Sequence, residues 1–164
     1  MSDDFVNLLR RLADAGVDFV VVGGFAGVAH GCTYVTQDID ICCEFSPDTL
    51  LALQKAISDL EPVHRMTPGR KKLALTEQQC SHLKNLYLDT TMGQLDCLSF
   101  IDGLGDFEQV KRASEVVEVE GLRLCVLSLD ALIKAKKSMN RPRDREALLQ
   151  LEAIKKLRRP KQGR

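Results

Sequence analysis

The chain has 164 residues, of which 45% are hydrophobic and 28% charged, and its formal net charge is zero. This size and composition are ordinary for one globular domain, which at this length buries roughly 70% of the surface of the unfolded chain and needs no disulfides to fold. No apolar run approaches the ~18 residues of a membrane span, which excludes a membrane-spanning class. The acidic start Met1-Ser2-Asp3-Asp4 lacks the features of a signal peptide, so we expect a cytoplasmic protein.

Hydrophobic periodicity and turn residues divide the chain into helices and strands. The elements of the first half, in chain order, are a helix at 3–15, a strand at 17–22, a short helix at 25–30, a strand at 37–43 and a helix from Ser46-Pro47 to about Leu60. The second half begins with an irregular, basic segment at 63–79, in which 71–76 is a candidate strand. It continues with a hairpin at 82–88 and 94–100, a hairpin at 115–119 and 122–126, and helices from Ser128 and from about Arg143. The pattern indicates an α+β domain.

Charge is distributed unevenly along the chain. Residues 131–164 contain twelve Lys or Arg against three Asp or Glu, a balance of +9, whereas residues 1–130 have a balance of −9. Such asymmetry indicates a basic face near a phosphate-bearing ligand, although a solvated C-terminal helix with a frayed end gives the same pattern. We predict one domain over residues 1–158 and a basic, disordered tail over residues 159–164.

The cysteines do not have the spacing of a zinc site or a disulfide framework. None forms a C-x-x-C pair, and none is followed by histidines at metal-binding intervals. A free cysteine in an apolar strand behaves as a small buried hydrophobic residue. We therefore predict reduced, structural thiols at all six positions, Cys32, Cys42, Cys43, Cys80, Cys97 and Cys125.

The strand at 17–22 ends in Gly23-Gly24, where the next helix is expected to begin. Without a Cβ atom, the two glycines let the backbone bend sharply and let a phosphate approach it closely. The start of the helix presents unpaired N–H groups and the positive end of its dipole to an anion. The segment lacks the G-x-G-x-x-G pattern of dinucleotide-binding folds, so the turn indicates a phosphate site of another kind.

Asp38 and Asp40 lie two residues apart on a predicted strand, so both side chains leave the same face. Their Cα atoms should be about 7 Å apart, from which two carboxylates can converge on a hard cation. Acids on an otherwise apolar strand are costly to bury unless a cation or hydrogen bonds compensate them. Solvated acids on an exposed strand are the alternative, but the nearby Gly-Gly turn favours a metal site.

Asp96 is a third carboxylate that interrupts an apolar strand, in Gly93-Gln94-Leu95-Asp96-Cys97-Leu98. If this strand lies beside the one with Asp38 and Asp40, three acids converge. Such a cluster suits two-metal phosphoryl or nucleotidyl transfer, in which ions ~3.5–4 Å apart hold the attacking and leaving oxygens.

These motifs together resemble the DNA polymerase β-like nucleotidyltransferase superfamily, whose pattern is an apolar strand, Gly-Gly or Gly-Ser, an Asp-x-Asp strand and a later strand aspartate. Within it, the chain is most similar to small bacterial and archaeal minimal nucleotidyltransferases related to abortive-infection toxins. The similarity covers most of the chain and includes residues 22–26, 36–41, 89–96, 127–133 and 136–144.

The resemblance implies a mixed, twisted β-sheet flanked by helices, with a short C-terminal helical pair. It also implies Mg²⁺- or Mn²⁺-dependent transfer of a nucleoside monophosphate from a nucleoside triphosphate (NTP) to a hydroxyl acceptor. Gly23 and Gly24 would then contact the triphosphate, and Asp38 and Asp40 would hold metal. Asp96 would complete the second metal site and help deprotonate the acceptor, so the three aspartates are the predicted catalytic and metal residues.

The resemblance further places Lys136 and Arg141 where they reach phosphate or position the acceptor. The planar guanidinium makes Arg141 the better phosphate clamp. A solvated helix end is the alternative for both residues. Asp144 is expected to orient Arg141 or cap the last helix rather than to bind metal.

The sequence departs from the superfamily pattern at one position. Relatives often carry an arginine shortly before the threonine of the Asp-x-Asp strand, and residues 32–36 contain none. Arg70, Lys71 or Lys72 would have to supply the missing charge.

Two other functions remain open at this level. The first is a nucleotide-binding module with little or no turnover that acts with a partner or antitoxin protein. The second is a subunit that supplies the nucleotide-binding domain while a partner chain brings the acceptor. The acceptor itself is undetermined among an RNA end, a protein side chain and a small hydroxylated molecule. The toxin-like resemblance and the basic C-terminal third favour RNA or protein.

Overall fold

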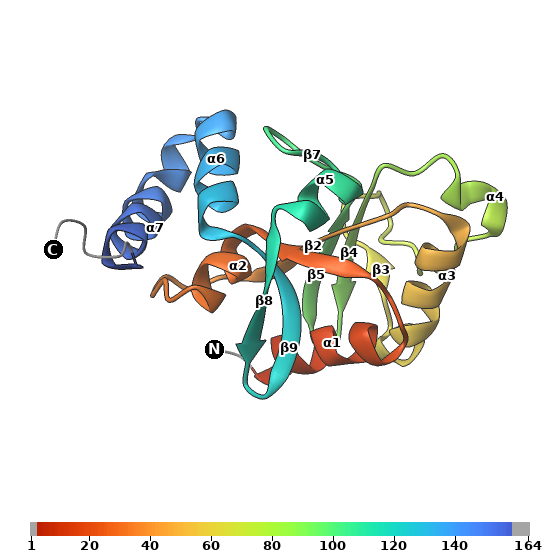
Figure 1. Cartoon of the computed structure of the whole chain (residues 1–164). Helices are drawn as coiled ribbons and strands as arrows, with labels where there is room; N and C mark the ends of the chain where they lie inside the picture. The colour runs from red at the N-terminus through yellow and green to blue at the C-terminus, as the bar shows by residue number, and fades with distance from the viewer. Residues whose placement is uncertain (1–2, 159–164) are drawn as a thin grey trace, which may run out of the picture.

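The computed structural model describes residues 3–158 and contains a mixed seven-stranded sheet (Figure 1). Its strands are β1 Phe19–Val22, β2 Asp38–Cys43, β3 Val63–His64, β4 Asn85–Thr90, β5 Gly93–Leu98, β8 Ser114–Val119 and β9 Leu122–Leu127. They lie in the order β3-β4-β5-β2-β1-β9-β8. The pairs β1–β9 and β2–β5 are parallel and the other neighbours are antiparallel. The predicted α+β fold with a mixed sheet is confirmed.

Helices flank this sheet, and a two-stranded hairpin lies beside it (Figure 1). The helices are α1 Asp3–Asp14, α2 Gly23–Ala29, α3 Pro47–Ala56, α4 Glu77–Cys80, α5 Phe107–Arg112, α6 Leu129–Met139 and α7 Arg145–Arg158, with 3-10 turns η1 Ser58–Leu60 and η2 Pro142–Asp144. The hairpin consists of β6 Phe100–Ile101 and β7 Gly105–Asp106. Helices α6 and α7 lie together at one end of the molecule next to α2, and they are the predicted C-terminal pair. No helix in the described part of the chain is long and apolar enough to cross a membrane.

The core explains why β2 carries two acids without losing its place in the sheet. Ile39 and Ile41 are fully buried on one face of the strand, whereas Asp38 and Asp40 are half-buried on the other. This alternation is the two-residue period of a strand with one apolar face. The sheet therefore holds the acids on a fixed surface rather than on a loop.

The predictions for shorter segments were less accurate. The expected strand at 71–76 is wrong, because only Lys72 forms an isolated bridge, with Val63. Helices α4 and α5 were not expected, although each begins with a capping box. The predicted tail at 159–164 lies outside the described residues.

All six cysteines are free, in agreement with the prediction of unpaired thiols, and five of them are buried. Burial raises the pKa of both the Cys42 and Cys43 thiols to about 12. Thiols with so high a pKa stay protonated near neutral pH and are poor nucleophiles and metal ligands.

Candidate active site

Asp38, Asp40 and Asp96, called the acidic cluster below, lie on two neighbouring strands. β2 and β5 run parallel, and their register pairs Asp40 with Asp96. One carboxylate oxygen from each of the three residues lies within 4.8 Å of the others. The convergence expected from the sequence is therefore present, and it results from a strand pairing that spans more than fifty residues of chain.

The acidic cluster concentrates negative charge in a partly buried place. The pKa of Asp40 is raised to about 8, first because the carboxyl is buried and second because Asp38 and Asp96 carry like charges. Burial and then Asp96 also raise the pKa of Asp38, while the nearby Arg65 opposes that rise. Three adjacent carboxylates are unstable in their ionised form at neutral pH unless a cation joins them.

The donor set of the acidic cluster fits a hard divalent cation. Carboxylate oxygens are the ligands that Mg²⁺ and Mn²⁺ prefer, and three residues supply them within a few ångströms. Oδ1 of Asp96 is buried and accepts no hydrogen bond from the described residues, although Nη1 of Arg65 lies 2.8 Å away, so it keeps acceptor capacity for a metal. Asp38, Asp40 and Asp96 are thus the residues that would hold Mg²⁺ or Mn²⁺.

Gly23 is required where the backbone passes closest to the acidic cluster. Its φ is +66°, in the left-handed region that favours glycine, and a Cβ at this position would collide with the carboxylate of Asp40. The helix α2 begins at Gly23 itself, two residues before the predicted start. The carbonyl oxygen of Gly24 accepts a 2.9 Å hydrogen bond from the hydroxyl of Tyr34, which fixes the turn from the other side.

The acidic cluster and the Gly-Gly turn line one cavity of about 1420 Å³. Further lining residues come from α6, η2, the start of α7 and the β6–β7 hairpin. All seven residues predicted for the site line this cavity: Gly23, Gly24, Asp38, Asp40, Asp96, Lys136 and Arg141. Their chemical roles stay predictions.

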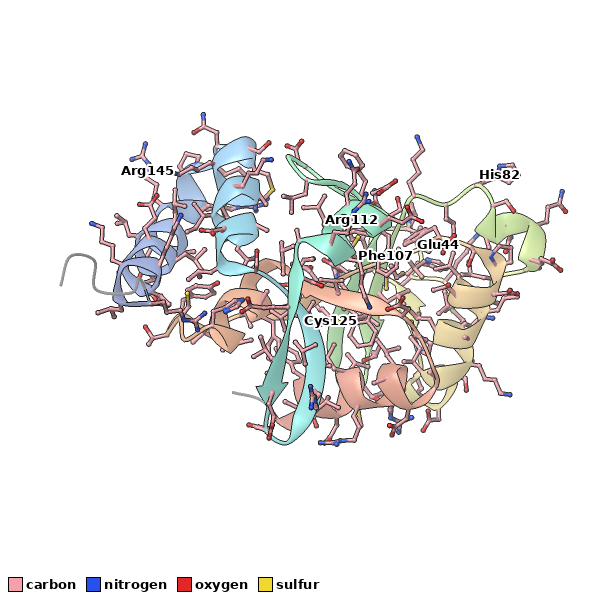
Figure 2. The ribbon with its side chains drawn as sticks, viewed as in Figure 1. Glu44, His82, Phe107, Arg112, Cys125 and Arg145 are labelled. Atoms are coloured by element: carbon pink, nitrogen blue, oxygen red, sulfur yellow. The ribbon has the colours of Figure 1, made fainter. Side chains whose placement is uncertain are left out.

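Residues elsewhere on the surface lie apart from this cavity. In Figure 2, His82 lies beside α4 and Arg145 lies on α7, at opposite ends of the molecule. Among the described residues, no histidine lines the cavity. The charged residues of its lining are carboxylates, lysines and arginines.

Lys136, Arg141 and Asp144, called the basic cluster below, connect α6 to η2. Nζ of Lys136 lies 3.3 Å from Oδ1 of Asp144, and Nε of Arg141 donates to Oδ2 over 2.6 Å. Burial opposes ionisation of Asp144, but hydrogen bonds and charges from Arg141 and Lys136 outweigh it and lower the pKa of this carboxyl. Asp144 orients Arg141, as the sequence analysis expected.

Arg65 is a charged residue beside the site that the sequence analysis missed, as it missed Lys84 and Arg143 in the cavity lining. Arg65 follows β3 and contacts both carboxylate oxygens of Asp96, with Nη2–Oδ2 at 3.0 Å and Nη1–Oδ1 at 2.8 Å. The three cations expected to supply the missing charge do not line the cavity: Arg70 pairs with Asp89, and Lys71 and Lys72 are exposed. Arg65 lies three residues before the Pro68-Gly69 turn, in a segment without hydrophobic periodicity, so only the structure identifies it.

Comparison with known proteins gave matches in structure alone. No protein-family model and no curated protein sequence matches the chain. The lincosamide antibiotic adenylyltransferase LnuA, in its lincomycin-bound form, matches with a TM-score of 0.64 at 16% identity, over 94% of this chain and 98% of its own. ANT(2″)-Ia in complex with adenylyl-2″-tobramycin matches with a TM-score of 0.58 at 14% identity, over 96% of this chain and 95% of its own. A proposed nucleotidyltransferase from Thermotoga maritima matches with a TM-score of 0.56 at 20% identity, over 92% and 93%.

The chain has the nucleotidyltransferase fold. The matches extend over nearly the full length of this chain and of each protein named, so the fold agrees from α1 to the C-terminal helices. In this nucleotidyltransferase fold the acidic cluster lies on β2 and β5, and the Gly-Gly turn joins β1 to α2. The relationship to abortive-infection toxins stays a prediction.

Proposed function

We propose that the protein transfers a nucleoside monophosphate from an NTP to a hydroxyl group of a small acceptor, with Mg²⁺ or Mn²⁺ as cofactor. The observation that carries the proposal is the convergence of Asp38, Asp40 and Asp96 beside Gly23 on the wall of one large cavity. Similarity in fold to antibiotic adenylyltransferases supports the reaction class.

The chemistry divides between the two clusters. A bound divalent ion would polarise the phosphate and neutralise developing charge. Asp38 and Asp40 would hold that ion, and Asp96 would accept the proton of the acceptor hydroxyl as its oxygen bonds to the α-phosphorus and pyrophosphate leaves. Gly23 and Gly24 would let the triphosphate approach the backbone closely. Lys136 and Arg141 would face its negative charge from α6 and η2.

The size of the cavity favours a small acceptor over RNA or protein. Pockets for single small ligands usually measure about 300–1000 Å³. A cavity of about 1420 Å³ has room for a nucleotide and a second small molecule together. LnuA, in its lincomycin-bound form, and ANT(2″)-Ia, in complex with adenylyl-2″-tobramycin, are proteins of similar fold that bind small molecules. We therefore favour a small acceptor over the RNA or protein acceptor that the basic C-terminal third suggested.

The test is incubation of the purified protein with each α-phosphate-labelled NTP and Mg²⁺ or Mn²⁺. The acceptors are a panel of hydroxylated small molecules that includes lincosamides and aminoglycosides, with total RNA and lysate protein alongside. The double variant Asp38→Ala/Asp40→Ala is the control. Label on a small molecule that the variant does not produce supports the proposal.

Other outcomes separate the alternatives. Label on RNA or protein overturns the small acceptor and keeps the reaction. Nucleotide-induced thermal stabilisation without transfer to any acceptor favours the binding module that works with a partner protein. Full transfer by the double variant contradicts the assignment of the acidic cluster.

A further inference from the structure

Arg65 contacts the acidic cluster through Asp96. It does not line the cavity, but its two terminal nitrogens contact the two oxygens of Asp96 at 2.8 and 3.0 Å. The Nη2–Oδ2 contact is a hydrogen bond, whereas the shorter Nη1–Oδ1 contact lacks hydrogen-bond geometry and leaves Oδ1 unpartnered. Arg65 therefore supplies charge to Asp96 without using all of its acceptor capacity.

Arg65 also makes contacts with Tyr87 and Leu88 on β4, independently of Asp96. Its backbone N–H donates to the carbonyl of Tyr87 over 2.9 Å, and its guanidinium lies 5.8 Å from the centre of the Tyr87 ring. Nη1 also contacts the carbonyl oxygen of Leu88 at 3.4 Å. Only 20% of the side chain is exposed. These contacts hold the guanidinium beside Asp96 independently of the ion pair.

The charges of this region do not balance when only the protein is counted. When all three carboxylates of the acidic cluster are ionised, as metal binding requires, the one guanidinium in direct contact leaves an excess of two negative charges. One divalent ion neutralises that excess, whereas a second divalent ion would reverse it. A triphosphate brings the further negative charge that a second ion needs.

On the basis of the proposed function, we propose that Arg65 acts as a built-in cation that competes with divalent metal for Asp96. Without nucleotide, Arg65 limits the acidic cluster to weak binding of a single ion near Asp38 and Asp40. Binding of a second ion then requires the nucleotide. Arg65 is not among the residues that line the cavity, so we treat it as a positioning residue that works through Asp96. The competition is electrostatic: two cations on one carboxylate repel each other strongly where burial reduces screening.

Binding of Mn²⁺ tests the inference directly, measured from the loss of the electron paramagnetic resonance signal of the free ion, without and with a non-hydrolysable NTP analogue. Without nucleotide, Arg65→Gln should bind Mn²⁺ about tenfold more tightly than the wild type, because one positive charge beside Asp96 is gone. With the analogue bound, the gain should shrink to about threefold or less. Arg65→Lys keeps the charge and should bind Mn²⁺ within about twofold of the wild type.

Arg70→Gln is the matched control, because Arg70 also pairs with a strand aspartate, Asp89, but lies outside the cavity with 58% of its side chain exposed. Its Mn²⁺ affinity should equal that of the wild type. If Arg65 only stabilised the fold, Arg65→Gln would lower the melting temperature in EDTA while Mn²⁺ affinity stayed constant or fell, and the inference would be overturned while the proposed function stood. Absence of Mn²⁺ binding in the wild type and in folded Arg65→Gln alike would overturn the metal site itself and the inference with it.

Discussion

Two clusters of charged side chains border the same cavity, and they are balanced in opposite ways. In the acidic cluster on the sheet, three carboxylates share the single guanidinium of Arg65. In the basic cluster between α6 and η2, two cations share the single carboxylate of Asp144. Burial and repulsion from Asp38 and Asp96 raise the pKa of Asp40 to about 8. Arg141 and Lys136, by contrast, lower the pKa of Asp144. The first cluster has an excess of carboxylates, whereas each charge of the second has a partner within the protein.

The difference separates a site that is ready for a ligand from one that also has a structural task. Buried charges without partners destabilise a fold, so a chain keeps them where a ligand supplies the compensation. Paired charges need no ligand, and a phosphate that binds Lys136 or Arg141 must compete with Asp144. Substitutions in the acidic cluster should therefore reduce function at a gain in metal-free stability, and substitutions in the basic cluster should reduce stability first.

Asp40→Asn should give the largest effect on transfer. Loss of one metal-binding carboxylate in the centre of the cluster should lower the rate of nucleotidyl transfer about 1000-fold or more. The same change removes a buried charge, so the free energy of unfolding in EDTA at pH 8 should rise by about 1–3 kcal/mol, and the melting temperature should rise with it. Labelled-NTP assays and thermal denaturation measure the two effects. A variant that is both inactive and less stable than the wild type in EDTA would contradict the view that this carboxylate is uncompensated.

Gly23→Ala tests the close approach between the turn and the acidic cluster. The added Cβ collides with Asp40, so the carboxylate must move, and transfer should fall about 100-fold. Gly16→Ala is the matched control: Gly16 also has a left-handed φ, of +76°, but has nothing within 4 Å of an added Cβ. Both variants should lose about 1–2 kcal/mol of stability from backbone strain. Equal activity in the two variants would show that the position of Asp40 does not depend on Gly23.

The pH dependence of stability should expose the uncompensated charge in the metal-free protein. The pKa of Asp40 in the fold is about 8 against an ordinary 3.8, so between these values the folded chain holds a proton that the unfolded chain has released. Stability from this group is fully present below about pH 4 and is lost as the pH rises through about 8. In EDTA the melting temperature should fall by several degrees from pH 5.5 to 8.5, and Asp40→Asn should flatten that fall. Identical slopes in the two proteins would assign the pH dependence to other groups.

The sequence predicted the main elements and most of the site because their signals are local. The alternation of Asp38 and Asp40 with two isoleucines identifies both a strand and its polar face, and the Gly-Gly turn follows directly from an apolar run. The capping boxes Thr76–Gln79 and Asp106–Gln109 also contained enough information to predict α4 and α5, although few apolar residues accompany them.

The rest of the site depends on contacts between distant segments. The parallel register that pairs Asp40 with Asp96 has no signal in either strand alone, since parallel neighbours are joined only through long crossovers. Arg65 is separated from Asp96 by 31 residues and lies in a segment without periodicity. Both features come from tertiary packing, which a single sequence does not encode in any local pattern.

Asp144→Asn should lower the stability of the metal-free protein moderately, whereas Asp40→Asn should raise it. The change leaves Lys136, which is 8% exposed, beside a neutral amide, so the protein should lose about 1–3 kcal/mol of unfolding free energy. Transfer should fall by about tenfold or less, because the two cations remain in the cavity but lose their orientation. Chemical denaturation and NTP saturation curves measure both effects. Since the pKa of Asp144 is lowered in the fold, its stabilising effect is present above its ordinary pKa and is lost as the pH falls, so the two proteins should become equally stable in acid.

Tyr34→Phe should produce the smallest change. It tests whether the Gly-Gly turn needs the hydrogen bond from the Tyr34 hydroxyl to keep its position. The hydroxyl of Tyr34 donates to the carbonyl of Gly24 over 2.9 Å, and its loss should cost about 1 kcal/mol of stability. A looser turn at Gly24 should raise the KM for the NTP about threefold, with kcat within about twofold of the wild type, because the acidic cluster and its strands are untouched. A fall in kcat at constant KM would instead mean that Tyr34 acts on the acidic cluster. Such a result would extend the uncompensated region of the cavity from the sheet to the loop before β2.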